Sequence, residues 1–165
     1  GSPESVIRAV RHDLPMMLAI IGGDPRRFRP FVDLYHRAWS QIGKPALPLG
    51  VHSHGHVAAT DEEAMETVWP HYRTMFNRIG RERGWPPVSR EQFEYEVREG
   101  SQYIGAPETV ARKIAATVQA LGAQRFDMKY SMGGLPHDRM MSCIELYGAK
   151  VIPMVREILD GAKAA

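Results

Sequence analysis

The sequence contains two nearly identical copies of a motif that begins helices in α/β proteins. Residues 1–6 read Gly-Ser-Pro-Glu-Ser-Val, and residues 105–110 read Gly-Ala-Pro-Glu-Thr-Val. Proline suits the first position of a helix, and a glutamate in the first turn complements the helix dipole. Each copy is followed by a helical pattern and then by an apolar strand, as in βαβ units. Because the first copy stands at residue 1, we expect the chain to start just after a strand.

The pattern along the rest of the chain predicts a parallel sheet with helical connections. Residues 14–21 form a continuous apolar run, which indicates a strand buried on both faces. Further strands are predicted at residues 49–58 and 125–131, and three strands are too few for a closed barrel, which needs about eight. Residues 85–104 are interpreted as an inserted, mobile segment that covers a pocket. The second copy of the motif would then follow this insertion rather than a strand and would act as a helix cap.

The composition is that of one soluble globular domain. Of the 165 residues, 44% are apolar and 24% are charged, as is usual for a folded domain. The net charge of +2 gives no reason to expect a nucleic acid or a membrane as partner, and the longest apolar run is too short to span a bilayer. The single cysteine, Cys143, excludes a disulfide framework and fits a reducing compartment. We therefore expect a cytoplasmic protein whose partner is a small-molecule substrate.

The first copy of the motif is a candidate phosphate site. The free N–H groups at a helix N-terminus and the positive end of the helix dipole favour an anion. Gly1 lets the backbone approach a ligand, and the hydroxyl groups of Ser2 and Ser5 can donate hydrogen bonds. The same residues are also those expected of an ordinary helix cap. The local sequence leaves both interpretations open.

Three histidines alternate along the second predicted strand. Residues two apart in a strand lie on one face, so His52, His54 and His56 are expected to face the same way. Such a row could bind zinc, could supply a general acid or base, or could form the polar wall of a pocket. The sequence identifies no carboxylate from another strand that would complete a metal site, and we predict none.

Three segments occur in an informative order along the chain. Residues 2–5 are followed by the start of the strand at Leu14-Pro15-Met16. The second copy, at residues 105–110, continues to Leu121-Gly122, and residues 146–153 come last. In this order the segments resemble, respectively, the fifth-strand exit with the sixth strand, the G-x-P-E helix before the eighth strand, and the last helix of the bacterial luciferase-like family of flavin-dependent monooxygenases. The resemblance extends over nearly the whole chain.

The resemblance implies an α/β fold in which residues 1–165 are a single partial domain. This domain would be the C-terminal half, strands six to eight with their helices, of a (β/α)8 TIM barrel. Half a barrel leaves two sheet edges unpaired and an apolar inner face uncovered. We therefore expect the chain to associate with a second copy of itself or with the N-terminal half, and the isolated fragment to be inactive.

The resemblance also implies a cofactor and its site. Reduced flavin mononucleotide (FMN) would bind at the carboxyl ends of the strands, with its phosphate on the turn formed by Gly1, Ser2 and Ser5. Ile20 would lie near the flavin ring. His52 and His54 would face the pocket as catalytic residues.

The function predicted on this basis is that of a flavin-dependent oxidoreductase. It would be a monooxygenase that uses reduced FMN and oxygen on a small organic substrate. One alternative is a deazaflavin-dependent oxidoreductase, since some relatives use a deazaflavin. The other is a metal-dependent barrel hydrolase that uses His52, His54 and His56.

Overall fold

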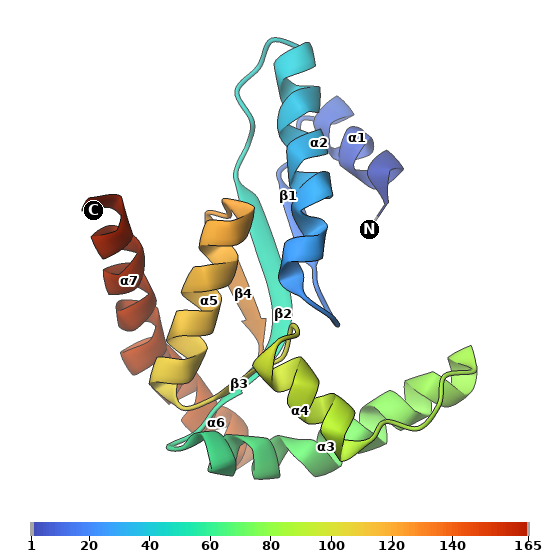
Figure 1. Ribbon diagram of the computed structural model, residues 1–165, viewed down its shortest axis with the longest axis vertical. Helices are drawn as coiled ribbons and strands as arrows, with labels where there is room; N and C mark the ends of the chain where they lie inside the picture. Colours follow the sequence, from blue (N-terminus) through green and yellow to red (C-terminus); the bar gives the residue numbers. More distant parts are fainter. Residues whose placement is uncertain (1, 165) are drawn as a thin grey trace.

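The computed structural model describes residues 2–164, which form a parallel sheet with its connecting helices, an open part of a barrel (Figure 1). A 3-10 turn at Pro25–Phe28 precedes α2, and a π turn at Tyr147–Val151 joins α6 to α7. In chain order, the helices and strands are α1 (Pro3–Arg11), β1 (Met16–Ala19), α2 (Arg29–Gln41), β2 (Leu49–Val57), α3 (Asp61–Arg83), α4 (Arg90–Arg98), β3 (Tyr103–Gly105), α5 (Pro107–Leu121), β4 (Arg125–Lys129), α6 (His137–Leu146) and α7 (Ile152–Ala164).

Strand β2 is the centre of the sheet. Leu18 of β1 and Phe126 of β4 both pair in parallel with Val51 of β2. Toward its carboxyl end, β2 pairs in parallel with β3, where His56 lies opposite Ile104. The predicted parallel sheet with helical crossovers is therefore confirmed, and the strands at residues 49–58 and 125–131 lie close to their predicted positions.

Strand β3 corrects the prediction for the second copy of the motif. The second copy begins at Gly105, the last residue of β3, so it follows a strand and not an insertion without one. A strand of three residues is too short to show either an apolar run or an alternating pattern, so no sequence pattern indicates it.

The outer face of the sheet carries the main apolar core. Leu18 and Val51 point toward α1 and α2, whose buried side chains include Val10, Tyr35 and Trp39. A second cluster joins the carboxyl end of β2 and strand β3 to α5 and to the C-terminal helices, with Val57, Tyr103 and Ile114 among its buried members. These two clusters attach helices to a single face of the sheet, whereas on the opposite, inner face Phe76 of α3 contacts His54 of β2.

The inner face corrects two predictions. Burial along β1 alternates, with Met16 and Leu18 buried and Met17 43% exposed, so the strand is not buried on both faces. A Cβ atom at Gly50 would lie 2.6 Å from the Cε atom of Met17 and 3.6 Å from the Cβ atom of Arg125, so these residues share the inner face. Alternation along β2 and β4 then makes this face mostly polar, not apolar, with His52, His54, Arg125, Asp127 and Lys129 on it.

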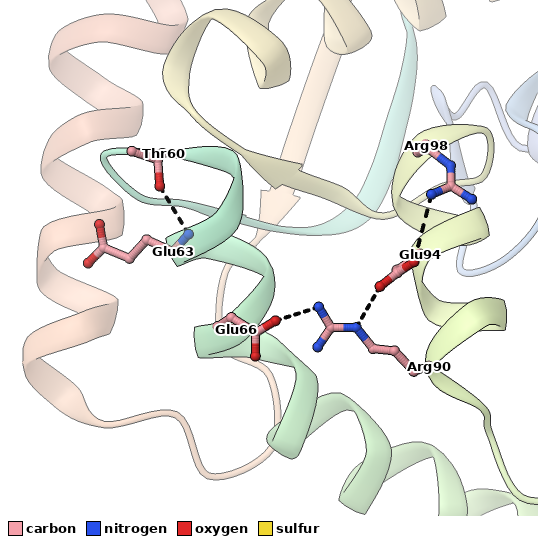
Figure 2. A network of polar contacts seen from close by, with 6 residues as sticks. All are labelled: Thr60, Glu63, Glu66, Arg90, Glu94 and Arg98. Carbon is pink, nitrogen blue, oxygen red and sulfur yellow. Dashed lines mark hydrogen bonds and ion pairs between the residues drawn. The ribbon is translucent and has the colours of Figure 1, made fainter.

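Helices α3 and α4 lie across the carboxyl end of β2 (Figure 1). Tyr72 of α3 stacks on Phe76 with ring centroids 4.1 Å apart and contacts Phe93 of α4 at 4.9 Å. Arg90 at the start of α4 donates to Glu66 of α3 and to Glu94, as Figure 2 shows. Apolar contacts and ion pairs together therefore attach α4 to α3.

The C-terminal helical run from α6 to α7 is interrupted by the π turn. The π turn at Tyr147–Val151 ends two residues before Pro153, and the proline ring would clash with a carbonyl four residues earlier in a regular helix. The wider π turn accommodates the proline without ending the helix. Within residues 2–164, no helix combines the length and the apolar character needed to cross a membrane.

Candidate functional site

The first copy of the motif forms the N-terminus of α1. Ser2 is the N-cap, and its hydroxyl group accepts a hydrogen bond from the Ser5 amide at 3.3 Å. The hydroxyl oxygens of Ser2 and Ser5 lie 3.3 Å apart at the protein surface. Hydrogen bonds from its own amide and from the Ser2 hydroxyl lower the pKa of Glu4. Gly1, the third residue predicted here, lies outside the described residues.

The second copy shows what the same turn can bind. Asp61, the first residue of α3, accepts a hydrogen bond from the Ala106 amide at 2.7 Å and one from the Thr109 hydroxyl at 3.1 Å. A Cβ atom at Gly105 would lie 2.5 Å from the Asp61 carboxylate, so only glycine allows this approach. Ala106, the N-cap residue of α5, makes no side-chain capping hydrogen bond; its amide and the Thr109 hydroxyl instead bind a carboxylate from a distant part of the sequence.

The two copies align residue by residue without gaps, so each donor group of the second copy has a counterpart in the first. Ala106 corresponds to Ser2, and Thr109 corresponds to Ser5. The groups that hold the carboxylate in the second copy therefore correspond to the Ser2 amide and the Ser5 hydroxyl in the first. An oxyanion bound to the first copy would meet the same pair of donors at a helix N-terminus.

The three predicted histidines lie on the central strand, β2. His54 is 7% exposed, its ring meets Phe76 edge-on at 6.4 Å, and its Nδ1 atom has no hydrogen-bond partner among the described residues. Burial, with smaller contributions from Lys129 and His52, lowers the pKa of His54 to about 4. His54 is therefore neutral at neutral pH, and its ring can take part in a hydrogen bond without carrying a charge. His52 lies on the same inner face, half-buried between Ala19 and Asp127.

His56, the third histidine, is 2% exposed at the carboxyl end of β2. Burial and the charge of Arg139 lower its pKa, and Glu63 opposes them. No group of three or more histidine, cysteine, aspartate or glutamate side chains within residues 2–164 is arranged to hold a metal ion. The metal-dependent hydrolase considered from the sequence therefore has no ligand set in this part of the chain.

Ile20 differs from its expected environment. Its side chain is fully buried in the outer core, while its carbonyl oxygen accepts a hydrogen bond from Ser53 at 2.8 Å. The next residue, Ile21, is 51% exposed. Any ligand near this strand end would therefore meet the side chain of Ile21, or the main chain of Ile20, before the side chain of Ile20.

Two carboxylates that bind turns at the carboxyl ends of the strands were not identified from the sequence. Asp61 lies 45 residues before Ala106, and Glu96 of α4 accepts hydrogen bonds from Gly23, which lies 73 residues earlier. Asp61 stands in the first turn of α3, where an acidic residue is expected for the helix dipole alone, and Glu96 stands near the end of α4 among other charged residues. The sequence therefore contained no separate signal for a contact with a distant turn.

The comparison with known protein families agrees with this architecture. The sequence profile described as luciferase-like monooxygenase matches residues 1–125. The chain belongs to this family. A search of curated proteins finds no significant match.

Solved structures of luciferase-like proteins show the same fold. A monooxygenase from Streptomyces bottropensis is 21% identical, with a TM-score of 0.75 over 92% of this chain and 45% of the other. The oxygenating constituent of 3,6-diketocamphane monooxygenase from Pseudomonas putida, in complex with FMN, is 19% identical, with a TM-score of 0.68 over 92% and 45%. A coenzyme F420 dependent tetrahydromethanopterin reductase from Methanopyrus kandleri is 17% identical, with a TM-score of 0.60 over 92% and 48%. The chain thus spans less than half the length of these structures.

Proposed function

We propose that this chain provides the phosphate-binding part of a flavin-dependent monooxygenase that uses reduced FMN and oxygen on a small organic substrate. The observation that carries the proposal is the carboxylate of Asp61 on the second copy of the motif. It demonstrates that this turn holds an oxyanion through one amide and one hydroxyl group. At the first copy the phosphate would accept from the matching groups of Ser2 and Ser5, which lie at the surface.

The inner face of the sheet would accommodate the rest of the cofactor and the substrate. When it is bound, reduced flavin is the group that reacts with oxygen. The residues of this chain would bind the flavin, orient it and shield it from water. His54, neutral at neutral pH, would form a hydrogen bond through Nδ1, which is buried and free of other partners among the described residues. Phe76, which packs against the His54 ring, excludes water from this atom. His52 would act beside it from the same face.

A deazaflavin is a second candidate cofactor. The Methanopyrus structure is named for coenzyme F420, which is a deazaflavin, whereas the Pseudomonas structure contains FMN. Both coenzymes carry a phosphate on the chain attached to the ring. The proposed contacts of Ser2 and Ser5 would serve either one.

The test is a fluorescence titration of FMN and of riboflavin, which lacks the phosphate. Replacing both Ser2 and Ser5 by alanine removes the Ser5 hydroxyl donor and the Ser2 hydroxyl beside it but leaves the Ser2 amide, and should weaken FMN binding by about 1–3 kcal/mol. Riboflavin binding should not change. Ser89→Ala is the matched control, because Ser89 caps α4 in the same way, with Gln92 N donating to its hydroxyl at 3.1 Å. Equal FMN affinity in the double variant and the wild type would show that the phosphate binds elsewhere.

The partner that we propose is the remainder of the barrel. Within residues 2–164, β1 and β4 each pair only with β2, so one edge of each strand has no neighbour. The related structures are about twice as long, which leaves room for the missing strands. Without that half, the open edges should make the 165-residue chain self-associate. Sedimentation tests this, and a compact monomer that unfolds cooperatively would mean that these strands need no further partner.

A further inference from the structure

The turn that follows β1 lies where ligands bind in barrels of this kind. The carboxyl ends of parallel strands form the rim of the site in such folds. Gly22 and Gly23 follow the strand, and Gly23 has a φ angle of +74°, in the left-handed region that favours glycine. Because glycine permits several backbone conformations, the conformation of this turn depends on the hydrogen bonds that it makes with its neighbours.

Glu96 of α4 holds this turn. Both of its carboxylate oxygens accept a hydrogen bond from the Gly23 amide, each at 3.0 Å, and one accepts from the Ser101 amide at 3.3 Å. A Cβ atom at Gly100 would lie 2.1 Å from the carboxylate, so Gly100 leaves the space that the folded-back side chain requires. Gln102 adds a long contact of 3.4 Å from its amide nitrogen to the carbonyl of Ile21.

Glu96 is itself held in place from two sides. The ammonium group of Lys113 on α5 donates to the carbonyl oxygens of Glu96, Val97 and Gln102, which lie at and just beyond the end of α4. At the other end of α4, Arg90 is paired with Glu66 of α3 at 2.5 Å (Figure 2). The carboxylate therefore projects from a helix that is attached at both ends.

We propose that Glu96 is a positioning residue that fixes the turn after β1, through Gly23, at the rim of the flavin site. The flavin part of this statement rests on the proposed function, whereas the positioning of the turn does not. The turn and the segment from α4 to β3 would move as one unit, so that a ligand bound to one would also change the position of the other. A hydrogen bond to an ionised carboxylate is stronger than one between neutral groups, which suits it to this purpose.

Hydrogen exchange of the Gly23 amide, followed residue by residue by NMR in the full 165-residue chain, tests the proposal. Gly23 should exchange most slowly in the wild type and at least tenfold faster in Glu96→Ala. Glu96→Gln retains one oxygen that can accept from Gly23, so its rate should fall between the two. Glu91→Ala, on the exposed side of the same helix, is the control and should leave the rate unchanged.

Equal Gly23 exchange in the wild type and the Glu96 variants would overturn the proposal, as would the same acceleration in Glu91→Ala. If Glu96→Ala does not fold, the comparison of Glu96→Gln with the wild type decides. Faster exchange then supports positioning, and equal exchange refutes it. The measurement needs no flavin. Failure of FMN to bind would therefore refute the proposed function and leave the role of Glu96 to be judged by exchange alone.

Discussion

The two copies of the motif open helices of similar design in different surroundings. At the start of α5, the Ala106 amide and the Thr109 hydroxyl hold the carboxylate of Asp61. At the start of α1, the hydroxyl groups of Ser2 and Ser5 lie at the surface, 3.3 Å from each other. The same local sequence therefore produces an internal clamp around Asp61 in one place and an exposed helix N-terminus in the other. The difference is whether a neighbouring helix supplies a carboxylate.

The largest expected difference between the two regions is in how the stability of each helix depends on pH, and it comes from Lys113 of α5. Lys113 lies six residues after the motif proline in α5, where α1 has Ala9. Burial lowers the pKa of Lys113 to about 8 from its usual 10.5, although Glu96 and Glu99 oppose the shift. As the pH rises through this interval, the native state loses the proton before the unfolded chain does, so the free energy of unfolding should increase. The increase should be about 3 kcal/mol.

Denaturant unfolding at a series of pH values measures this effect of Lys113. Lys113→Met should remove the increase, whereas Lys129→Met, at an exposed lysine of β4, should retain it. The same pH dependence in the wild type and in Lys113→Met would show that this lysine titrates as it does in the unfolded chain.

Removing the Asp61 clamp should change the free energy of unfolding by somewhat less than the titration of Lys113 does. Asp61→Ala leaves the Ala106 amide and the Thr109 hydroxyl without their charged partner, and should lower the free energy of unfolding by about 1–2 kcal/mol. Glu62→Ala is the matched control, because Glu62 lies in the same helical turn and is exposed. Thermal or urea unfolding of both variants measures the difference. If Glu62→Ala costs as much as Asp61→Ala, the helix dipole explains the effect and the clamp does not.

An added anion should partly restore the second copy in Asp61→Ala. Sulfate or phosphate can then reach the groups that Asp61 occupied, and at several times its Kd should stabilise the variant by about 1 kcal/mol more than the wild type. Melting temperatures measured at constant ionic strength, with chloride as the comparison salt, separate binding from screening. An equal shift in the variant and the wild type would argue that this turn does not bind free oxyanions, and would weaken the case for phosphate at Ser2 and Ser5.

The smallest effect is expected at the first copy in the absence of ligand. Ser2→Ala removes an N-cap and should cost about 0.5–1 kcal/mol of stability. Thermal unfolding should therefore show a smaller loss than in Asp61→Ala. A loss larger than that of Asp61→Ala would reverse the comparison, since the first copy would then be the structurally important one.

Much of the fold was predictable because its signals are local. The parallel strand pairs follow from apolar runs bounded by glycine. The helix starts follow from capping residues such as Ser2, Thr60 and Ser89, whose side chains each accept a backbone hydrogen bond. The shared face of the histidines followed from the period of a strand. Strand β3 was not predictable, because its three residues are recognisable only through their pairing with β2.

The candidate site was predictable only in part. The sequence indicated the first copy of the motif as an anion site, but not that its twin already binds a carboxylate. It suggested that residues 85–104 form a mobile cover, and their mobility remains a prediction. The contacts of Glu96 and Gln102 with the turn after β1 connect residues that are 73 and 81 positions apart. Contacts at such distances leave no periodic trace in a single sequence.

The sequence by itself determined the class of the fold, the direction of the sheet and the positions of most helix ends, because backbone geometry and burial impose short periods on the residues involved. Only the tertiary structure decided which face of β1 is covered, which carboxylate reaches which turn, and which of the two motif copies is open. Those outcomes depend on how helices far apart in the chain pack around β2. One side chain, that of Asp61, makes the difference between a closed turn and an open one.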